Sequence, residues 1–501
     1  MSQNLDHEAA TRIADVATTP WQTRDPLKRR RTKIVATLGP ASHDVDTIER
    51  LILAGVNVFR LNMSHGDHQS HRRAHERVRA AAEKLGEPVA ILADLCGPKL
   101  RVGKFAGGQI ELVSGSHVVV TTRDVVGEPG LIPSQYAGLA GDLRPGDRIL
   151  LDDGVLELRV EAIERTDVAC LVVYGGVLKD RKGMNLPGVN VSAPAMTVKD
   201  REDARLALEL GVEFLALSFV RRPSDFDELK SLLAATHQDT QVIAKIERPE
   251  AVVTIDDILD ACDGIMVARG DLGVELPPEI VPVVQRRLVA RARAKGKPAI
   301  VATQMLESMI DHPRPTRAEV SDVSTAVFSG ADAIMLSAET ASGAHPVAAV
   351  EMMDRVARQI EAHLWEEGAF GSITDREAAA PPLSLPAAIA RSTAQLSRDL
   401  RVRSVVVLTD TGTTARLVAA ARPAAPVIVV GPDLGTCRRS NLLWGTVPVQ
   451  VDADHLRHPQ ALARRIAVDL GLAGEGQYLV TIAGFKTSPQ ESAPTITTFR
   501  V

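Results

Sequence analysis

The chain has 501 residues, of which 45% are hydrophobic and 3% are aromatic, and its formal net charge is −5 at pH 7. This length and composition predict two or three domains with large aliphatic cores, and they exclude a chain that is disordered over most of its length. The modest net charge argues against a nucleic-acid-binding protein. Because no uncharged apolar run approaches the roughly 18 residues of a membrane helix, we expect no membrane span.

The amino-terminal residues and the cysteines bear on the cellular compartment. Residues 1–27 form a polar leader without the basic start and apolar centre of a signal peptide. The cysteines are scattered and lack metal-binding spacing: Cys96, Cys170, Cys262 and Cys437. We therefore expect a cytoplasmic protein with reduced thiols. The basic run KRRRTK, residues 28–33, is interpreted as a solvated arm before the first strand, with a phosphate-attracting patch as the alternative.

Strand-like and helix-like patterns alternate along the first two thirds of the chain. TKIVATLG, VNVFRLN and PVAILADL are β-like runs, and helical patterns separate them. The alternation stops at residues 98–195, where short β-like runs lie between Gly, Pro and Asp turns, and then resumes. Eight strand–helix units are counted in all. They predict a (β/α)8 TIM barrel formed by residues 28–97 and 196–365, with a small β-barrel domain inserted at residues 98–195.

The last part of the chain predicts a separate domain. Residues 366–382 are interpreted as a linker, and residues 383–501 as an α/β domain. This domain contains the run TDTGTTAR, which predicts a strand, a turn and a helix whose amides and hydroxyls suit a phosphate. An ordinary glycine turn followed by a threonine N-cap explains the run about as well.

Polar side chains follow the predicted barrel strands at their carboxyl ends. Active sites of TIM barrels lie at this end of the strands. The residues found there are Arg60, Asn62, Asp94, Lys245, Glu247, Asp271, Thr303, Ser337 and Glu339. One or two polar strand ends would mean little, whereas this many at one rim indicate a site.

Two carboxylates and a lysine stand out within this set. Lys245 and Glu247 are two residues apart on one strand, so they point the same way, and Asp271 closes the next strand. Taken alone, the first two residues are better explained as a structural salt bridge. The polar rim favours a different interpretation, in which the two acids hold a divalent ion, Mg²⁺ or Mn²⁺, and the lysine faces an anionic substrate.

From about residue 31 onward the chain resembles the pyruvate kinase family. The resemblance rests on the motifs KIVATLGPAS, FRLNMSHG, KGMNLPG, KIE, GIMVARGDLGVE, ATQMLESM, PTRAEVSDV and MLSAET. It implies a glycolytic enzyme that transfers the phosphoryl group of phosphoenolpyruvate to ADP, giving pyruvate and ATP. It also implies a three-domain subunit that usually assembles as a homotetramer.

The resemblance implies roles for the rim residues. Glu247 and Asp271 would hold the divalent ion, and Lys245 would neutralise the moving phosphoryl group and the enolate. Arg60 would brace the phosphoryl oxygens. The amides of Gly270 and Asp271 would receive the substrate carboxylate.

Further roles concern the proton and the nucleotide. Thr303 would line the pocket where the enolate is protonated, and Ser337 would belong to the proton path. The residues that would face the nucleotide are Asn62, His65, Arg101 and Lys182. For Ser337 and His65 a purely structural role is an equal alternative. Because Arg101 and Lys182 lie in or beside the inserted domain, we expect this domain to close over the site as a lid.

One departure from the family pattern concerns the monovalent cation. Many members have DTKGPEIR where this chain has DLCGPKLR, and they require K⁺ near the positions of Asn62, Ser64 and Asp94. Here Lys99 replaces the glutamate, and Leu95 replaces a threonine. An ammonium group near those oxygens would substitute for the ion, as in the K⁺-independent branch that the chain resembles. We expect that K⁺ is not required.

The resemblance extends to the last domain through TDTGTTAR, RPAAP and LLWGTVPV. In the family this domain often binds a regulatory sugar phosphate or nucleotide at the first of these runs, which would make the enzyme allosteric. The effector candidates here are Thr411, Gly412, Thr413 and Thr414.

Two other functions are the alternatives. A lyase or aldolase on a related barrel also binds pyruvate-like acids through a divalent ion, but it needs neither the lid nor the Lys182 segment. A non-catalytic metabolite sensor is the second alternative. Loss of Lys245, Glu247 or Asp271 would favour it, and all three are present.

Overall fold

The computed structural model describes residues 30–236, 238–370, 382–483 and 494–501. The predicted leader and most of the predicted linker lie outside these residues. Within them, no helix is both long and apolar enough to cross a membrane.

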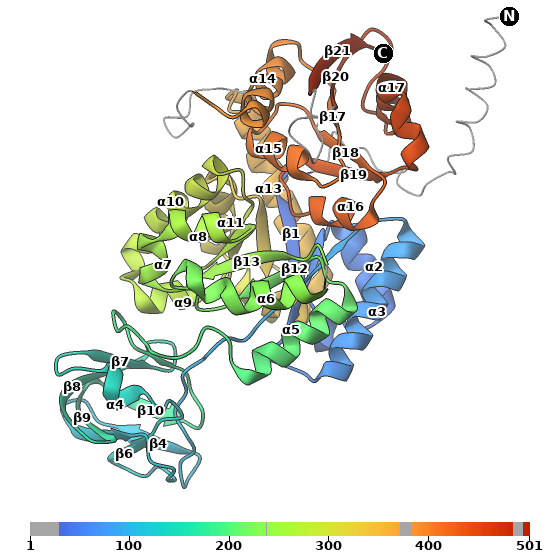
Figure 1. Cartoon of the computed structure of the whole chain (residues 1–501). Coiled ribbons are helices and arrows are strands. Elements are labelled where there is room, and N and C mark those ends of the chain that lie inside the picture. The colour runs from blue at the N-terminus through green and yellow to red at the C-terminus, as the bar shows by residue number, and fades with distance from the viewer. Residues whose placement is uncertain (1–29, 237, 371–381, 484–493) are drawn as a thin grey trace, which may run out of the picture. The chain divides into compact units, whose positions relative to one another are not determined.

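Eight parallel strands close into a barrel, in the order β1-β16-β15-β14-β13-β12-β3-β2, as predicted (Figure 1). The barrel strands are β1 (Lys33–Thr37), β2 (Val58–Asn62), β3 (Ala90–Asp94), β12 (Phe214–Leu217), β13 (Gln241–Ile246), β14 (Gly264–Ala268), β15 (Ala299–Ala302) and β16 (Ala333–Leu336). Every residue of β1, β3, β12, β14, β15 and β16 is buried. Such apolar runs suit parallel strands whose two faces are both covered.

Helices alternate with the barrel strands along the chain. They are α2 (Val45–Ala54), α3 (His68–Leu85), α5 (Val198–Leu210), α6 (Asp227–Thr236), α7 (Pro249–Val253), α8 (Ile255–Ala261), α9 (Arg269–Glu275), α10 (Val281–Ala294), α11 (Arg317–Phe328), α12 (Ala338–Ala341) and α13 (Pro346–Glu366). Helix α2, for example, starts at Asp44, whose side chain accepts a hydrogen bond from the Thr47 amide. It ends at Gly55, whose φ of 118° suits a residue without Cβ.

Two details of this region differ from the sequence analysis. The single helix expected after β13 is two helices, α7 and α8, which meet at Thr254. Strand β14 ends at Ala268, so Asp271 is the third residue of α9 instead of the last residue of a strand.

The inserted residues form two sheets, with strand orders β11-β7-β8-β9-β5-β6 and β10-β4. The strands are β4 (Gln109–Leu112), β5 (His117–Thr121), β6 (Leu131–Pro133), β7 (Arg148–Leu151), β8 (Leu156–Glu164), β9 (Asp167–Tyr174), β10 (Gly176–Lys179) and β11 (Met184–Asn185). Alternate residues of β4 and β9 are buried, and with Leu156, Leu158 and Val160 of β8 they join one apolar core. The short helix α4 (Leu139–Asp142) was not expected.

The carboxyl-terminal residues form an α/β domain with the sheet order β19-β18-β17-β20-β21. Its strands are β17 (Ser404–Leu408), β18 (Val427–Gly431), β19 (Thr446–Gln450), β20 (Tyr478–Ala483) and the antiparallel β21 (Thr495–Arg500), and its helices are α14 (Leu385–Asp399), α15 (Thr413–Ala420), α16 (Leu434–Ser440) and α17 (Pro459–Asp469). Val405 and Val406, adjacent on β17, belong to two different apolar clusters. Both faces of the sheet are therefore covered.

The chain divides into two compact units. The first comprises the described parts of residues 1–59, 72–91 and 306–501, and the second comprises those of residues 60–71 and 92–305. In the first unit, the Arg30 side chain is 5% exposed and donates to Asp354, and Arg31 donates to the Pro423 and Ala424 carbonyl oxygens. The interpretation of the basic run as a solvated arm is therefore wrong for these two residues.

Candidate active site

Lys245 lies at the carboxyl end of β13, in the second unit, and meets three oxygen-bearing side chains. Its Nζ is 3.0 Å from Glu247 Oε1 and 3.2 Å from Asp94 Oδ1, and it donates to Ser218 Oγ at 2.7 Å. The expectation that Lys245 and Glu247 point the same way is met. Ser218, which follows β12, is a contact that the sequence analysis missed, because a hydroxyl after an apolar run carries no distinctive signal.

Asp94 joins Lys245 to a second cation, Arg60. Both Nε and a terminal nitrogen of Arg60 are 2.7 Å from Asp94 Oδ2. Burial acts to raise the pKa of Asp94, but the charges of Lys245 and Arg60 outweigh it and hold that pKa below its usual value. One buried carboxylate therefore holds two cations side by side, which suits a substrate that carries several negative charges.

Glu247 is 1% exposed and accepts a hydrogen bond of 2.7 Å from the Phe219 amide. Burial and the nearby charge of Asp271 raise the pKa of Glu247 to about 7, although Lys245 opposes them. Burial acts to lower the pKa of Lys245, but the charges of Asp94 and Glu247 outweigh burial and raise that pKa above its usual value. The ammonium therefore keeps its charge. The amide that binds Glu247 belongs to a residue with a φ of 55°, a strained conformation for phenylalanine.

Asp271 and Gly270 lie at the start of α9, beside Thr303. The Gly270 amide donates to Thr303 Oγ1 at 2.7 Å, and this hydroxyl in turn donates to the Ala302 carbonyl oxygen at 2.6 Å. Thr303 has a φ of 70°, and Arg269 supports it by donating to its carbonyl oxygen at 2.6 Å. Arg269 is a further residue that the sequence analysis missed.

The carboxylates of the site decide whether it suits a divalent ion. Within the described residues, no group of three or more His, Cys, Asp or Glu side chains could hold a metal. The two acids predicted as ligands nevertheless interact, because the charge of Asp271 raises the pKa of Glu247. A buried carboxylate beside a second one suits a hard cation whose remaining ligands are substrate oxygens and water. Glu247 and Asp271 therefore fit Mg²⁺ or Mn²⁺.

Two of the predicted nucleotide residues lie where β2 ends: Asn62 is the last residue of the strand, and His65 lies in the turn that follows it. Asn62 Oδ1 accepts a hydrogen bond of 3.2 Å from the Ser64 amide, and the His65 amide donates to the Asn62 carbonyl oxygen at 3.2 Å. Lys199 Nζ donates to the Met63 carbonyl oxygen at 2.7 Å and so fixes the turn from α5. The sequence analysis missed Lys199.

The other two, Arg101 and Lys182, belong to the inserted domain. Arg101 donates to the Arg181 carbonyl oxygen at 3.0 Å and forms a β-bridge with Gly183. Lys182 Nζ is 2.7 Å from Asp152 Oδ1. The structure therefore brings Arg101 and Lys182 to the same edge of the domain, and it pairs the lysine with an aspartate that the sequence analysis did not single out.

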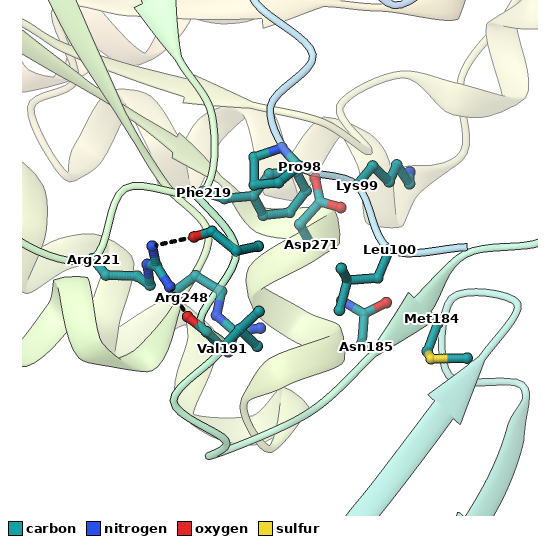
Figure 2. Close-up of a pocket in the computed structure, with 11 residues that line it drawn as sticks. Pro98, Lys99, Leu100, Met184, Asn185, Val191, Phe219, Arg221, Arg248 and Asp271 are labelled. Atoms are coloured by element: carbon teal, nitrogen blue, oxygen red, sulfur yellow. Dashed lines mark hydrogen bonds between the residues drawn. The ribbon is translucent and has the colours of Figure 1, made fainter. Parts of the chain in front are cut away.

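A pocket lies between the inserted domain and the strand ends (Figure 2). It is lined by Pro98, Lys99, Leu100, Met184, Asn185, Val191, Ala193, Phe219, Arg221, Arg248 and Asp271. A predicted metal ligand, Asp271, and the lysine predicted to replace K⁺, Lys99, thus line the same pocket. Leu95 and Cys96 lie shortly before the lining residues Pro98 and Lys99 in the chain. The Leu95 carbonyl oxygen accepts a hydrogen bond of 2.7 Å from the Ser218 hydroxyl.

Ser337 and the effector candidates lie in the first unit. The Ser337 amide donates to Glu339 Oε2 at 2.7 Å. Thr411 Oγ1 is 3.2 Å from Thr413 Oγ1, and the Gly412 amide donates to Thr409 Oγ1 at 3.0 Å. Gly412, with a φ of 82°, is the N-cap of α15, so no threonine side chain caps this helix, and Thr414 is buried.

The barrel and its charged pocket define a class of protein, an enzyme that acts on an anionic substrate. Comparison with known proteins supports this class. Residues 29–350 match the family model "Pyruvate kinase, barrel domain", and residues 387–497 match "Pyruvate kinase, alpha/beta domain". The chain is 45% identical to pyruvate kinase 2 of Synechocystis sp., over 91% of this chain and 76% of the relative. It is 44% identical to the pyruvate kinase of Geobacillus stearothermophilus, over 91% of this chain and 78% of the relative.

A solved structure agrees. The crystal structure of a pyruvate kinase from Cryptosporidium parvum matches with a TM-score of 0.87 and 34% identity, over 94% of this chain and 97% of that one. The chain therefore belongs to the pyruvate kinase family and is a phosphotransferase.

Proposed function

We propose that the enzyme transfers the phosphoryl group of phosphoenolpyruvate to ADP, with Mg²⁺ or Mn²⁺ held by Glu247 and Asp271, as a cytoplasmic step of glycolysis. The observation that carries the proposal is the meeting of Lys245 with Asp94 and Glu247 within 3.2 Å, with Arg60 on the far oxygen of Asp94. The cations Lys245 and Arg60 suit an anionic ester, and the acids Glu247 and Asp271 suit a divalent ion. Glu247 and Asp271 would hold this ion, which would neutralise negative charge on the substrate.

The protein's own residues position the reactants. A β-phosphate oxygen of ADP forms a bond to phosphorus while the ester oxygen of phosphoenolpyruvate leaves as an enolate, and a proton on the terminal carbon then gives pyruvate. Arg60 and Lys245 stabilise the charge that develops on the phosphoryl and enolate oxygens. Thr303 lines the protonation pocket, and Ser337 belongs to the proton path. A substrate carboxylate at the amides of Gly270 and Asp271 requires that the Thr303 hydroxyl turn away.

The nucleotide binds between the turn after β2 and the inserted domain. Asn62 comes from the end of β2 and His65 from the turn, whereas Arg101 and Lys182 come from the inserted domain, which closes as a lid. Because Asp152 holds Lys182 in this structure, the nucleotide phosphates have to compete for its ammonium. A sugar phosphate or nucleotide effector binds at the turn from Thr411 to Thr414, and the subunits assemble as a homotetramer.

A coupled assay tests the reaction. Pyruvate should form from phosphoenolpyruvate only when ADP and a divalent ion are both present, and ATP should appear in equal amount. A lyase or aldolase would give pyruvate without ADP, and a sensor would bind phosphoenolpyruvate without turnover. Either result would refute the proposal.

We also propose that Lys99 makes K⁺ unnecessary. Lys99 lines the pocket of the site, and an ammonium near the oxygens of Asn62, Ser64 and Asp94 would supply the positive charge that a monovalent ion supplies in other members of the family. The wild-type rate in buffer free of Na⁺ and K⁺ should change little on addition of saturating KCl. The Lys99→Glu variant should become dependent on KCl. Activation of the wild type by tenfold or more would refute this part of the proposal.

A further inference from the structure

Residues 185–193, here called the return segment, lead from the inserted domain back to the barrel, and two barrel arginines hold them. Arg221 donates to the carbonyl oxygens of Val191 and, at 3.0 Å, of Ala193 (Figure 2). Arg248 donates to the Val189 carbonyl oxygen at 3.1 Å. Three backbone carbonyls of five consecutive residues are therefore fixed by charged donors, which make stronger hydrogen bonds than neutral ones.

The inserted domain holds the same segment from its other side. Ser192 Oγ is 2.9 Å from the Tyr136 hydroxyl, and the Ser192 amide donates to Asp142 Oδ2 at 2.8 Å. Tyr136 also donates to this aspartate. The return segment is thus bonded to the barrel through its carbonyls and to the inserted domain through Ser192, so it ties the two together.

Arg248 connects the return segment to the metal-binding elements. It immediately follows Glu247, and its NH1 donates to Glu275 Oε1 at 2.6 Å. Glu275 is the last residue of α9, the helix that carries Asp271, and its Oε1 also accepts from Asn185 Nδ2 at 3.1 Å. Arg248 and Glu275 are 6% and 7% exposed, so the pair is shielded from water.

We propose that Arg248 is a positioning residue, which fixes the return segment as the pivot of the lid and ties it to the two elements that bear Glu247 and Asp271. The inference rests on the proposed function, because it gives the lid the task of bringing Arg101 and Lys182 to the nucleotide. A fixed pivot lowers the conformational cost of ordering the lid when ADP binds.

The test uses the full-length Arg248→Met variant, which retains the length of the side chain and loses its donors. Hydrogen exchange of the amides of residues 186 and 188–193 should become about tenfold faster, because a charge-assisted anchor is lost. The KM for ADP should rise about threefold to tenfold, with kcat changed by less than about twofold, since the loosened lid is ordered by ADP itself. A lysine cannot reach both Glu275 and the Val189 carbonyl oxygen, so Arg248→Lys should lie between wild type and Arg248→Met.

Arg222→Met is the matched control, because the Arg222 side chain is 65% exposed and pairs with Asp225 at 3.6 Å. It should leave both exchange and the KM for ADP unchanged. Unchanged exchange of residues 186 and 188–193 in Arg248→Met would overturn the proposal, and so would acceleration spread evenly over the whole barrel, which would mark a merely structural ion pair. Exchange is measured without substrates, so it decides the pivot even if the wild-type protein fails to turn over phosphoenolpyruvate.

Discussion

At the scale of single residues, the site is organised by Asp94. This buried carboxylate bonds to Arg60 through one oxygen and lies 3.2 Å from Lys245 through the other. Without it, two cations would face each other in a region from which water is excluded, at a high electrostatic cost. The arrangement keeps Lys245 charged, and the first prediction concerns this charge.

Lys245→Met should lower kcat by about a thousandfold or more, because the variant lacks the charge that stabilises the transition state. Mg²⁺ binding should stay measurable, since Glu247 and Asp271 are unchanged. Steady-state kinetics and metal titration provide the two measurements. Lys84→Met, which removes an exposed partner of Glu49, is the control and should have wild-type kcat. A Lys245→Met enzyme with a tenth of normal kcat would show that the charge is dispensable.

His75 gives a prediction about pH and stability. Burial, together with the charges of Arg79 and Arg438, lowers the pKa of His75 to about 4, and its Nε2 has no hydrogen-bond partner among the described residues. The folded protein therefore keeps this imidazole neutral, whereas the unfolded chain protonates it below a pKa of about 6.5. The stability present above about pH 6.5 should be lost as the pH falls toward about 4.

The measurement is the free energy of unfolding of wild type and His75→Gln at pH 7 and pH 5. The wild type should lose on the order of 1 kcal/mol more than the variant over this interval, a value discounted because His75 is only partly buried. Equal losses in the two proteins would show that His75 does not carry this pH dependence.

At the scale of elements, the start of α5 links a helix cap to the first connection between barrel and inserted domain. Thr197 Oγ1 accepts from the Asp200 amide at 3.1 Å, and Asp200 Oδ2 accepts from the Thr197 amide at 2.8 Å. The other carboxylate oxygen of Asp200 accepts from the Gly97 amide at 3.0 Å. The capping box therefore also places Gly97, whose φ is 68°.

Thr197→Ala should lower the free energy of unfolding by about 1 kcal/mol, the usual cost of a lost N-cap. Thr197→Ser retains the accepting oxygen and should lie within a few tenths of a kcal/mol of wild type. Denaturant unfolding of the three proteins is the measurement. An equal loss in both variants would assign the effect to the threonine methyl group instead of to the cap.

The elements also show which parts of the fold and site could be predicted from the sequence. Several barrel strands are apolar runs with polar or charged residues at their carboxyl ends, so the runs were predictable, and so was a rim at which Lys245 and Glu247 lie near other polar residues such as Asp94. A helix start at Gly270 and Asp271 was expected from the family resemblance, but the strand before it was expected to continue to Asp271, whereas β14 ends at Ala268 and α9 begins directly after it. Ser218 and the Phe219 amide were missed for a different reason: a hydroxyl and a backbone group contribute to the site without any charge in the sequence.

At the scale of the whole molecule, the buried Arg422 bonds to residues of the first unit that are far from it in the chain. Arg422 is 2.8 Å from Asp332 and donates to the Gly330 carbonyl oxygen at 2.6 Å. Its guanidinium also lies 4.9 Å from the centre of the Trp444 ring. The Arg422 and Asp332 side chains are 90 residues apart in sequence, so no local pattern could predict the pair.

Arg422→Met should lower the free energy of unfolding by about 3 kcal/mol, because it leaves the Asp332 carboxylate buried without its cation. Denaturant unfolding of the full-length protein is the measurement. Arg457→Met is the control, since its partner Asp454 is 85% exposed and such surface pairs contribute little. A loss below about 1 kcal/mol in Arg422→Met would mean that Asp332 finds another partner or that water solvates it.

The bond from Lys33 Nζ to the Thr446 carbonyl oxygen, 2.7 Å long, joins residues 413 positions apart. A ribosome that adds 5 to 20 residues per second needs roughly 20 to 80 s to make that stretch. Throughout this interval β1 has been made, but Thr446, whose carbonyl oxygen accepts from Lys33 in the finished protein, has not. The newborn chain therefore passes through a long period in which chaperones have an unfinished amino-terminal edge to protect.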